Sequence, residues 1–254
     1  HLEKLPNTKQ EGQGFPEMVI GLYDTVAAFD TQERKAWILA SDVANEIPSG
    51  ARELPEVRAQ KMATRISTAA ALDEPNLDSC GHWDFEMCQE EYEKLLGRVI
   101  DYIHAGDIFQ ANLTQRIIGT LPDTLDKFTL YRRLRALNPA PFAAYLSCGK
   151  DEAVLSASPE LFLSLDDAGH ITTRPIKGTR PRGATESEDA VLKGVLQNSE
   201  KDRAENLMIV DLLRNDLSRV CDVGSVRVGH LYSLETFATV HHLVSEVTGR
   251  LQTD

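Results

Sequence analysis

Apolar residues recur along this chain at two spacings, one typical of helices and the other of strands. The clearest helical pattern covers Glu90–Ala105, where apolar side chains return every three or four positions and Gly106 follows as a natural C-terminal stop. Weaker patterns of the same kind predict further helices at 58–70, 122–137, 186–199 and 202–214.

Short apolar or alternating runs of strand length occupy much of the remaining sequence. They predict strands at 17–23, 35–41, 107–118, 142–148, 152–157, 161–165, 170–175, 224–231 and 240–251. Strands cluster with strands and helices with helices, so we predict an α+β fold with large, mostly antiparallel sheets flanked by helices. A weakly patterned connector at 72–86 divides the chain, and we place a boundary there between a region at 1–79 and a domain at 80–254.

A β-hairpin is predicted for 156–179, with its turn at Asp166–Gly169. This turn would pair Leu165 with His170, and a tip shifted to Ala168–Gly169 is an alternative. Loop length fixes the register of a hairpin, and a slip of one residue moves every side chain of a strand to the other face of the sheet.

The base of this hairpin brings Glu160 and Lys177 to one face in both of those registers. In the first, Glu160 lies opposite Pro175 and Lys177 is its diagonal neighbour, about 7–8 Å away. In the second, the two residues are directly opposite, whereas a three-residue loop would put them on opposite faces. The pattern is compatible with an exposed ion pair worth about 0–1 kcal/mol. A reactive site is the alternative, favoured by the rigid backbone at Pro159 and by Gly178, where a ligand can approach the main chain.

The helix predicted at 202–214 has an acidic residue on its apolar side. Glu205 shares a face with Met208 and Ile209, so it would be partly buried, where an unpaired carboxylate is costly. Two partners remain open: a basic neighbour, Lys201 or Arg203, or a hard metal ion.

Two adjacent histidines, His241 and His242, open the alternating stretch at 240–245. Side chains of neighbouring strand residues point to opposite faces, so one histidine at most faces any given site. A histidine on a strand is more often a core or edge residue than a functional one.

Composition narrows the class of protein. The chain has 254 residues, 42% of them apolar, which is enough to build a core, and its formal net charge of −12 disfavours binding to nucleic acids or to anionic membranes. The four cysteines are scattered without a Cys-x-x-Cys pair, and no apolar run approaches the roughly 20 residues that span a bilayer. We therefore expect a cytoplasmic enzyme or binding protein with reduced thiols, and an anionic ligand would need local cations or a metal.

Several ordered segments resemble the chorismate-utilising enzymes, the family of the anthranilate, aminodeoxychorismate, isochorismate and salicylate synthases. The resemblance rests on their order along the chain rather than on any one of them. The segments are Gly106–Leu113, Ser156–Glu160, Arg174–Gly183, Asp202–Leu207 with Arg214–Asp216, and His242–Ser245.

The resemblance implies roles for individual residues. It makes Glu160 the acid/base for the departing ring hydroxyl, and it makes Glu205 a ligand of Mg²⁺, which in turn binds the ring carboxylate of chorismate. It also places His242 beside the reacting ring. We further expect substrate contacts from three residues, Gln110, Gly178 and Thr179.

One position indicates a subfamily. The form Pro-Ile-Lys-Gly-Thr, with Lys177, resembles the aminodeoxychorismate synthases, whereas anthranilate synthases usually carry a small residue there. Isochorismate-type enzymes tend to place a lysine base near the position of Gln110, which cannot deprotonate water. The resemblance thus implies Mg²⁺-dependent amination of chorismate at C4 through a covalent Lys177 intermediate, in 4-aminobenzoate and folate biosynthesis, with ammonia from a glutamine amidotransferase subunit or domain.

Two other functions stay open. One is an anthranilate synthase component I, which aminates chorismate at C2 for tryptophan biosynthesis. The other is a non-catalytic fragment that docks an amidotransferase, because family members continue through a Gly-Ser-x-Thr-Gly-Ala-Pro-Lys motif and further metal-binding glutamates that this sequence lacks. We accordingly expect 1–79 to be the tail of an N-terminal region and 80–254 a chorismate-binding catalytic domain without its C-terminal part. By itself it should bind chorismate weakly and turn over little.

Overall fold

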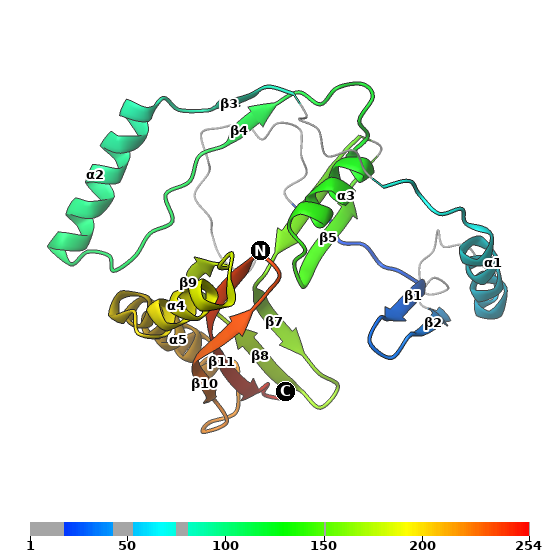
Figure 1. Ribbon diagram of the computed structural model, residues 1–254. Helices are drawn as coiled ribbons and strands as arrows, with labels where there is room; N and C mark the ends of the chain where they lie inside the picture. The colour runs from blue at the N-terminus through cyan, green and yellow to red at the C-terminus, as the bar shows by residue number, and fades with distance from the viewer. Residues whose placement is uncertain (1–17, 43–52, 75–80, 150, 254) are drawn as a thin grey trace. The chain divides into compact units, whose positions relative to one another are not determined.

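The computed structural model describes residues 18–42, 53–74, 81–149 and 151–253 (Figure 1). The chain divides into two compact units, His1–Glu74 with Lys150–Glu152, and Pro75–Gly149 with Ala153–Asp254. The boundary predicted between 79 and 80 lies outside the described residues.

The first unit contains a hairpin and a helix. Strands β1, Thr25–Asp30, and β2, Lys35–Ala40, pair antiparallel, and α1, Pro55–Thr68, packs against them. The strand predicted at 17–23 is wrong, because none of residues 18–23 is in a strand. The turn after Asp30 sets the pairing of β1 with β2. The Asp30 carboxylate accepts hydrogen bonds from two backbone N–H groups of this turn, and the paired residues begin at Asp30 and Lys35.

In the second unit, α2, Gln89–Ala105, confirms the clearest helical pattern. Its start is closed by Glu91, whose side chain accepts a hydrogen bond from the backbone of Cys88, and its end by Gly106 in the left-handed conformation with φ of 80°. The strand predicted at 107–118 is mostly wrong, because strand structure is limited to β4, Ile117–Gly119, which pairs with β3, Trp83–Phe85.

Helix α3, Lys127–Leu137, begins later than the pattern predicts because Asp126 is its N-cap. The Asp126 carboxylate accepts hydrogen bonds from the backbone N–H groups of Phe128 and Thr129, at 2.9 and 3.0 Å. Strands β5, Phe142–Ser147, and β6, Ala153–Ser158, form an antiparallel pair against which α3 packs.

The largest sheet of the described residues contains five strands around one central strand (Figure 1). Strand β11 pairs with β10 on one side, and β8 and β9 follow each other along its other side, with β7 beyond β8. The pairing is antiparallel throughout. The strands are β7, Leu161–Leu165; β8, His170–Arg174; β9, Ile176–Pro181; β10, Arg227–Thr236; and β11, Val240–Arg250.

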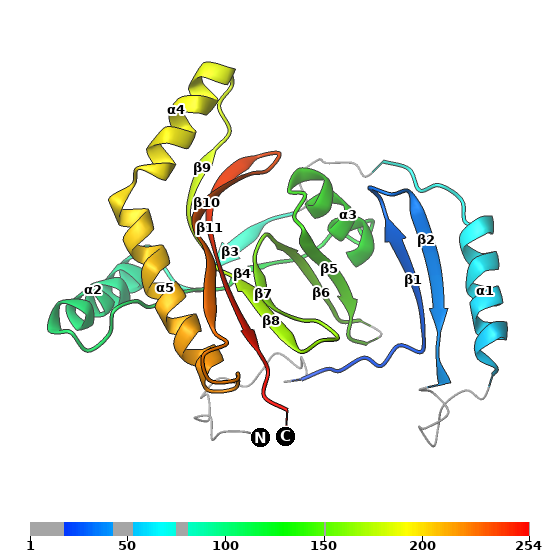
Figure 2. The ribbon, with the colours of Figure 1, turned by 90° about the horizontal axis from the view of Figure 1, so that it is seen from below.

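Helices α4, Glu186–Gln197, and α5, Glu200–Ser218, cover one face of this sheet (Figure 2). Alternate residues of β11 face them: Val247 packs in a core with Val210 and Leu217 of α5, and Ser245 hydrogen-bonds to Asn206. None of the helices in the described ranges has the length and apolar content needed to cross a bilayer.

We predict that Val247→Ala lowers the free energy of unfolding by about 2 kcal/mol, because two buried carbons and their packing are lost. Val247 is fully buried. Val223→Ala is the matched control, since that side chain is fully exposed, and it should change the free energy by less than about 0.5 kcal/mol. Urea unfolding followed by circular dichroism measures both, and equal effects would contradict the assignment of the core.

Candidate active site

The register of the β7–β8 hairpin is set by two features that compensate each other. At the tip, Leu165 pairs with Ile171 rather than with His170, which is the register of a three-residue loop. Between Ser164 and Leu161 a bulge then places one extra residue in β7, so that Leu161 pairs with Arg174. The predicted tip is therefore wrong, but the bulge restores the register predicted for the base.

Glu160 consequently lies directly before β7, next to the pair that Leu161 forms with Arg174. Its Oε1 accepts a hydrogen bond of 3.0 Å from the backbone N–H of Ile176, the first residue of β9. This places the carboxylate against the Pro175–Ile176 peptide group, one residue before Lys177. In the part of the chain that the structure describes, no hydrogen bond or ion pair joins the Glu160 and Lys177 side chains.

Lys177 is half-buried and sits in a second bulge. Ile176 pairs with Val244 and Thr179 pairs with His242, so that Lys177 and Gly178 together face one residue of β11.

Gly178 has φ of 92°, a conformation that favours glycine. A Cβ there would lie 2.8 Å from Cβ of Asp202 and 3.0 Å from Cδ1 of Leu196. The expectation was that a ligand approaches the main chain here, but the groups that approach Gly178 in the structure are these side chains of α5 and α4.

His242 is buried beside Thr179. Its Nδ1 and Oγ1 of Thr179 share a hydrogen bond of 2.9 Å, and the Phe237 ring lies 5.5 Å away between centroids. Burial lowers the pKa of His242, and the carboxylates of Glu235 and Glu160 oppose this shift. The imidazole therefore favours its neutral form, and Thr179, expected to contact substrate, here contacts the histidine.

An arginine and two glutamates, which the sequence did not single out, lie next to this histidine. Glu235 is the cross-strand partner of His242, and it forms a hydrogen-bonded ion pair with Arg174. Arg174 also lies 3.6 Å from Glu246. The sequence signal that could have identified Arg174 is its position directly before the Pro-Ile-Lys-Gly-Thr segment.

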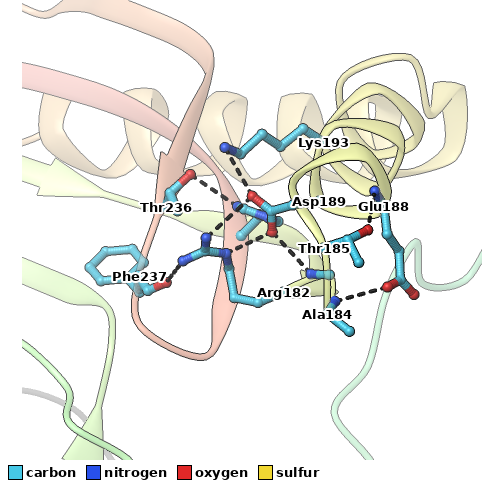
Figure 3. Close-up of polar contacts among 10 residues, drawn as sticks. Arg182, Ala184, Thr185, Glu188, Asp189, Lys193, Thr236 and Phe237 are labelled. Atoms are coloured by element: carbon cyan, nitrogen blue, oxygen red, sulfur yellow. Dashed lines mark hydrogen bonds and ion pairs between the residues drawn. The ribbon is translucent and has the colours of Figure 1, made fainter.

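A more extensive network, also missed from the sequence, surrounds Asp189 of α4 (Figure 3). Its Oδ1 accepts from Nε of Arg182 at 2.7 Å, from the backbone N–H of Gly183 at 3.0 Å, and from Nε2 of His241 at 2.8 Å, while Nζ of Lys193 lies 3.1 Å from Oδ2. These contacts, Arg182 foremost, hold the pKa of Asp189 far below its usual range. The two histidines thus have different surroundings: His241 is fully buried against α4, and His242 contacts β9.

Helix α5 holds the predicted metal ligand. Glu205 is half-buried, and Nζ of Lys201 lies 3.8 Å from its carboxylate, while Arg203 lies over the ring of Tyr232 at 4.7 Å. Of the two basic neighbours considered, Lys201 is the partner. Across the described ranges, no three residues of the types that ligate metals gather closely enough to hold an ion.

Gln110 lies in the irregular segment between α2 and β4. Its Oε1 is buried and has no hydrogen-bond partner among the described residues. No contact in that part of the chain joins it to the other residues predicted for the site. Glu160, Lys177, Thr179 and His242 therefore form the candidate site, which combines a carboxylate, an amine and a neutral imidazole on neighbouring strands.

Comparisons with known proteins show which family the chain resembles. Residues 1–254 match the sequence profile of the family described as chorismate binding enzyme. Aminodeoxychorismate synthase component 1 of Klebsiella aerogenes is 40% identical over 249 residues, which cover 98% of this chain and 51% of that protein. Anthranilate synthase component 1 of Mycolicibacterium smegmatis is 37% identical over 268 residues, covering 100% of this chain and 50% of that protein.

The structure of anthranilate synthase component I from Streptococcus pneumoniae superposes with a TM-score of 0.76 at 29% identity, covering 91% of this chain and 50% of that one. This likeness confirms the predicted fold class. The chain spans about half the length of these relatives.

We predict that Asp189→Asn makes the free energy of unfolding less dependent on pH. The folded-state pKa of Asp189 is depressed, so its charge stabilises the fold above the ordinary aspartate pKa of about 3.9, and this contribution is lost as the pH falls below that value. The variant should be less stable than wild type at pH 7, with the difference shrinking toward pH 2.5. Urea unfolding at several pH values measures this.

The control is Asp211→Asn, which removes an exposed ion pair with Arg214 and should change stability little at pH 7. A difference between Asp189→Asn and wild type that stays constant from pH 7 to pH 2.5 would contradict the prediction.

Proposed function

The chain belongs to the family of chorismate binding enzymes, and from this membership we propose that it is the chorismate-aminating part of an aminodeoxychorismate synthase. The observation that carries the proposal is Lys177 in β9, next to the peptide N–H that the Glu160 carboxylate holds. Relatives named aminodeoxychorismate synthase, which are about 40% identical over most of the chain, support the proposal.

The proposed reaction replaces the C4 hydroxyl of chorismate by an amine in two displacements. The Lys177 amine forms a bond to C2 while both ring double bonds shift by one position, from C1–C2 to C1–C6 and from C5–C6 to C4–C5, and the C4–oxygen bond breaks. Ammonia then attacks C4, both double bonds shift back, and the bond between C2 and the lysine nitrogen breaks. Two successive displacements preserve the configuration at C4, which a single direct displacement would invert.

Proton transfers balance these steps. In the first displacement Glu160 gives a proton to the departing oxygen, which leaves as water, and the lysine nitrogen loses a proton after its bond forms. In the second, the nitrogen bonded to C4 loses a proton and the departing lysine nitrogen gains one. His242 is suited to accept a proton near the ring, because burial keeps its imidazole neutral. We propose Glu160 as the acid and His242 as a nearby base.

Magnesium belongs to the proposal through Glu205 alone. A bound Mg²⁺ would neutralise the ring carboxylate of chorismate, and oxygen ligands such as carboxylates are the ones it prefers. The described residues do not gather a set of ligands around Glu205, so they do not fit a complete site, and we derive no step through the ion.

The source of ammonia is part of the same proposal. We propose a glutamine amidotransferase subunit or domain as the partner, the cytoplasm as the location and 4-aminobenzoate and folate biosynthesis as the pathway. The naming of the Klebsiella relative as component 1 supports the existence of a partner component.

Two alternatives each have an observation in their favour. The likeness to anthranilate synthases favours amination at C2 in tryptophan biosynthesis. The name component 1 of the Klebsiella relative, which implies a second component, is compatible with a non-catalytic role in docking an amidotransferase. Binding of an amidotransferase by a chain that neither turns over chorismate nor forms an adduct would support the docking role.

We predict that incubation with chorismate, Mg²⁺ and ammonium, followed by acid quenching, traps an adduct on Lys177 with the mass of chorismate less one water. Peptide mass spectrometry maps the modified residue. Lys177→Ala should carry no adduct, and Lys35→Ala, which removes an exposed lysine of β2, should carry as much as wild type. Anthranilate as the product, with Lys177→Ala harmless, would defeat the proposal in favour of amination at C2.

We also predict that Glu160→Gln slows adduct formation by about 10²–10⁴-fold, because the leaving oxygen loses its proton donor while the side chain keeps its shape. Rapid quenching with quantification of the modified peptide gives the rate. Glu200→Gln, in the exposed first turn of α5, is the matched control and should leave the rate unchanged. Equal rates for wild type and Glu160→Gln would remove Glu160 from the reaction.

A further inference from the structure

The turn between β10 and β11, residues 237–240, is held from outside by Arg182. Nη1 of Arg182 donates to the carbonyl of Phe237 at 3.0 Å, and its backbone N–H donates to the carbonyl of Thr239 at 3.2 Å. Within the turn, the N–H of Phe237 donates to the carbonyl of Val240 at 2.8 Å. The place of the turn, and with it the place of the Phe237 ring, depends on where Arg182 is fixed.

Arg182 is itself fixed by Asp189 (Figure 3). Asp189 also accepts a hydrogen bond from Nε2 of His241 in the adjacent strand. On its other side the His241 ring contacts Thr236, with Nδ1 and Oγ1 3.0 Å apart. These contacts form a closed circuit. Arg182, directly after β9, contacts Asp189 of α4, and Asp189 contacts His241 of β11. His241 contacts Thr236 of β10, and the turn that follows Thr236 contacts Arg182 again.

The chemistry of this circuit specifies a tautomer. An ionised carboxylate accepts hydrogen bonds and donates none, so Nε2 of His241 carries a proton. In the neutral ring Nδ1 is then an acceptor, and the hydroxyl of Thr236 donates to it. The two hydrogen bonds fix the orientation of the His241 ring, and in the neutral ring they select the tautomer with the proton on Nε2.

This circuit includes Thr236, whose two neighbours in the chain both lie beside His242. Thr236 lies between Glu235, the cross-strand partner of His242, and Phe237, whose ring packs beside the imidazole. One peptide group joins the two histidines, so a displacement of the backbone at His241 also displaces the backbone at His242. With Nδ1 engaged by Thr179, the ring nitrogen of His242 left for a ligand is Nε2.

We propose that Asp189 and His241 are positioning residues for His242: their hydrogen bond fixes the β10–β11 turn so that the imidazole keeps its contact with Thr179 and presents Nε2 to the substrate. The proposal rests on the role of His242 in the proposed function. Neither Asp189 nor His241 touches the substrate in this account. They act through the strand and the turn.

Charged groups lie near both histidine rings and influence the signals that the experiment records. Glu235 and Glu160 face His242, and both oppose the effect of burial on its pKa. Asp189, with Arg182 and Lys193 bound to it, faces His241.

The experiment is two-bond ¹H–¹⁵N correlation spectroscopy on the full 254-residue chain labelled with ¹⁵N-histidine, which reports the tautomer and the titration of each of the seven histidines. His242→Gln and His241→Asn assign the two signals. In Asp189→Asn and in His241→Asn, we expect the single tautomer of His242 to become a mixture. Its titration midpoint should rise toward about 6.5, the ordinary value, because the ring becomes more accessible to water.

Two further variants separate positioning from general loss of stability. Val210→Ala removes buried carbons from the core that α5 shares with β11, so it should destabilise the fold and leave the tautomer and titration of His242 as in wild type. Thr236→Val removes the hydroxyl while keeping the shape of the side chain. It should shift His242 in the same direction as Asp189→Asn, and it decides the question if the aspartate variant does not fold.

A His242 signal unchanged in folded Asp189→Asn, or in Thr236→Val if the former does not fold, would overturn the proposal. In rate measurements the displaced imidazole should slow adduct formation by up to about 10²-fold, with little change in the chorismate concentration at half-maximal rate. The spectra need no turnover. If no variant, nor the wild type, forms an adduct, the proposed function fails while the spectra still decide whether Asp189 and His241 position His242.

Discussion

One buried negative charge, the carboxylate of Asp189, is the constraint on which this part of the fold depends. Taking a carboxylate out of water is costly unless nearby donors replace its hydration, and here Arg182, Gly183, His241 and Lys193 do so from several directions. Few arrangements of a helix and two strands satisfy all of these donors together. The hydrogen bonds that offset the cost of burying the Asp189 carboxylate therefore also fix the start of α4 against the end of β9 and the start of β11.

Elements with a strong period were predictable, and bulges were not. Helix α2 follows from apolar residues at helical spacing and a glycine stop, because both signals are local. The register at the base of the β7–β8 hairpin results from two irregularities that an alternating pattern cannot show, the three-residue tip after Asp166 and the extra residue between Leu161 and Ser164. Each shifts the register by one residue, and Glu160 reaches the start of β9 because the shifts cancel. A sequence shows which residue types are present, whereas register decides which of them meet.

The identity of a chemical group was easier to predict than its partner. Thr179 stands in a recognisable motif, yet its contact with His242 joins segments that are distant in the sequence. The contact of Glu205 with Lys201 was among the possibilities considered, because both residues lie one turn apart on the same helix. Asp189 is the converse case, a residue whose importance in the structure no motif in the sequence indicates. In the sequence it is one of several acidic residues in the first turn of a helix, a common pattern beside the helix dipole, and only the fold reveals that it binds Arg182.

Strand β11 combines support and chemistry by alternation. Residues that face the helices, such as His241 and Val247, are buried and have fixed partners, while His242 faces the other way, toward Thr179. Since adjacent residues of a strand share one peptide group, contacts that hold a side chain on the covered face also restrict the backbone position of its neighbour on the other face. The backbone of His242 is therefore restricted by contacts that lie outside the candidate site. This is why we propose that Asp189 acts on His242 from the covered face.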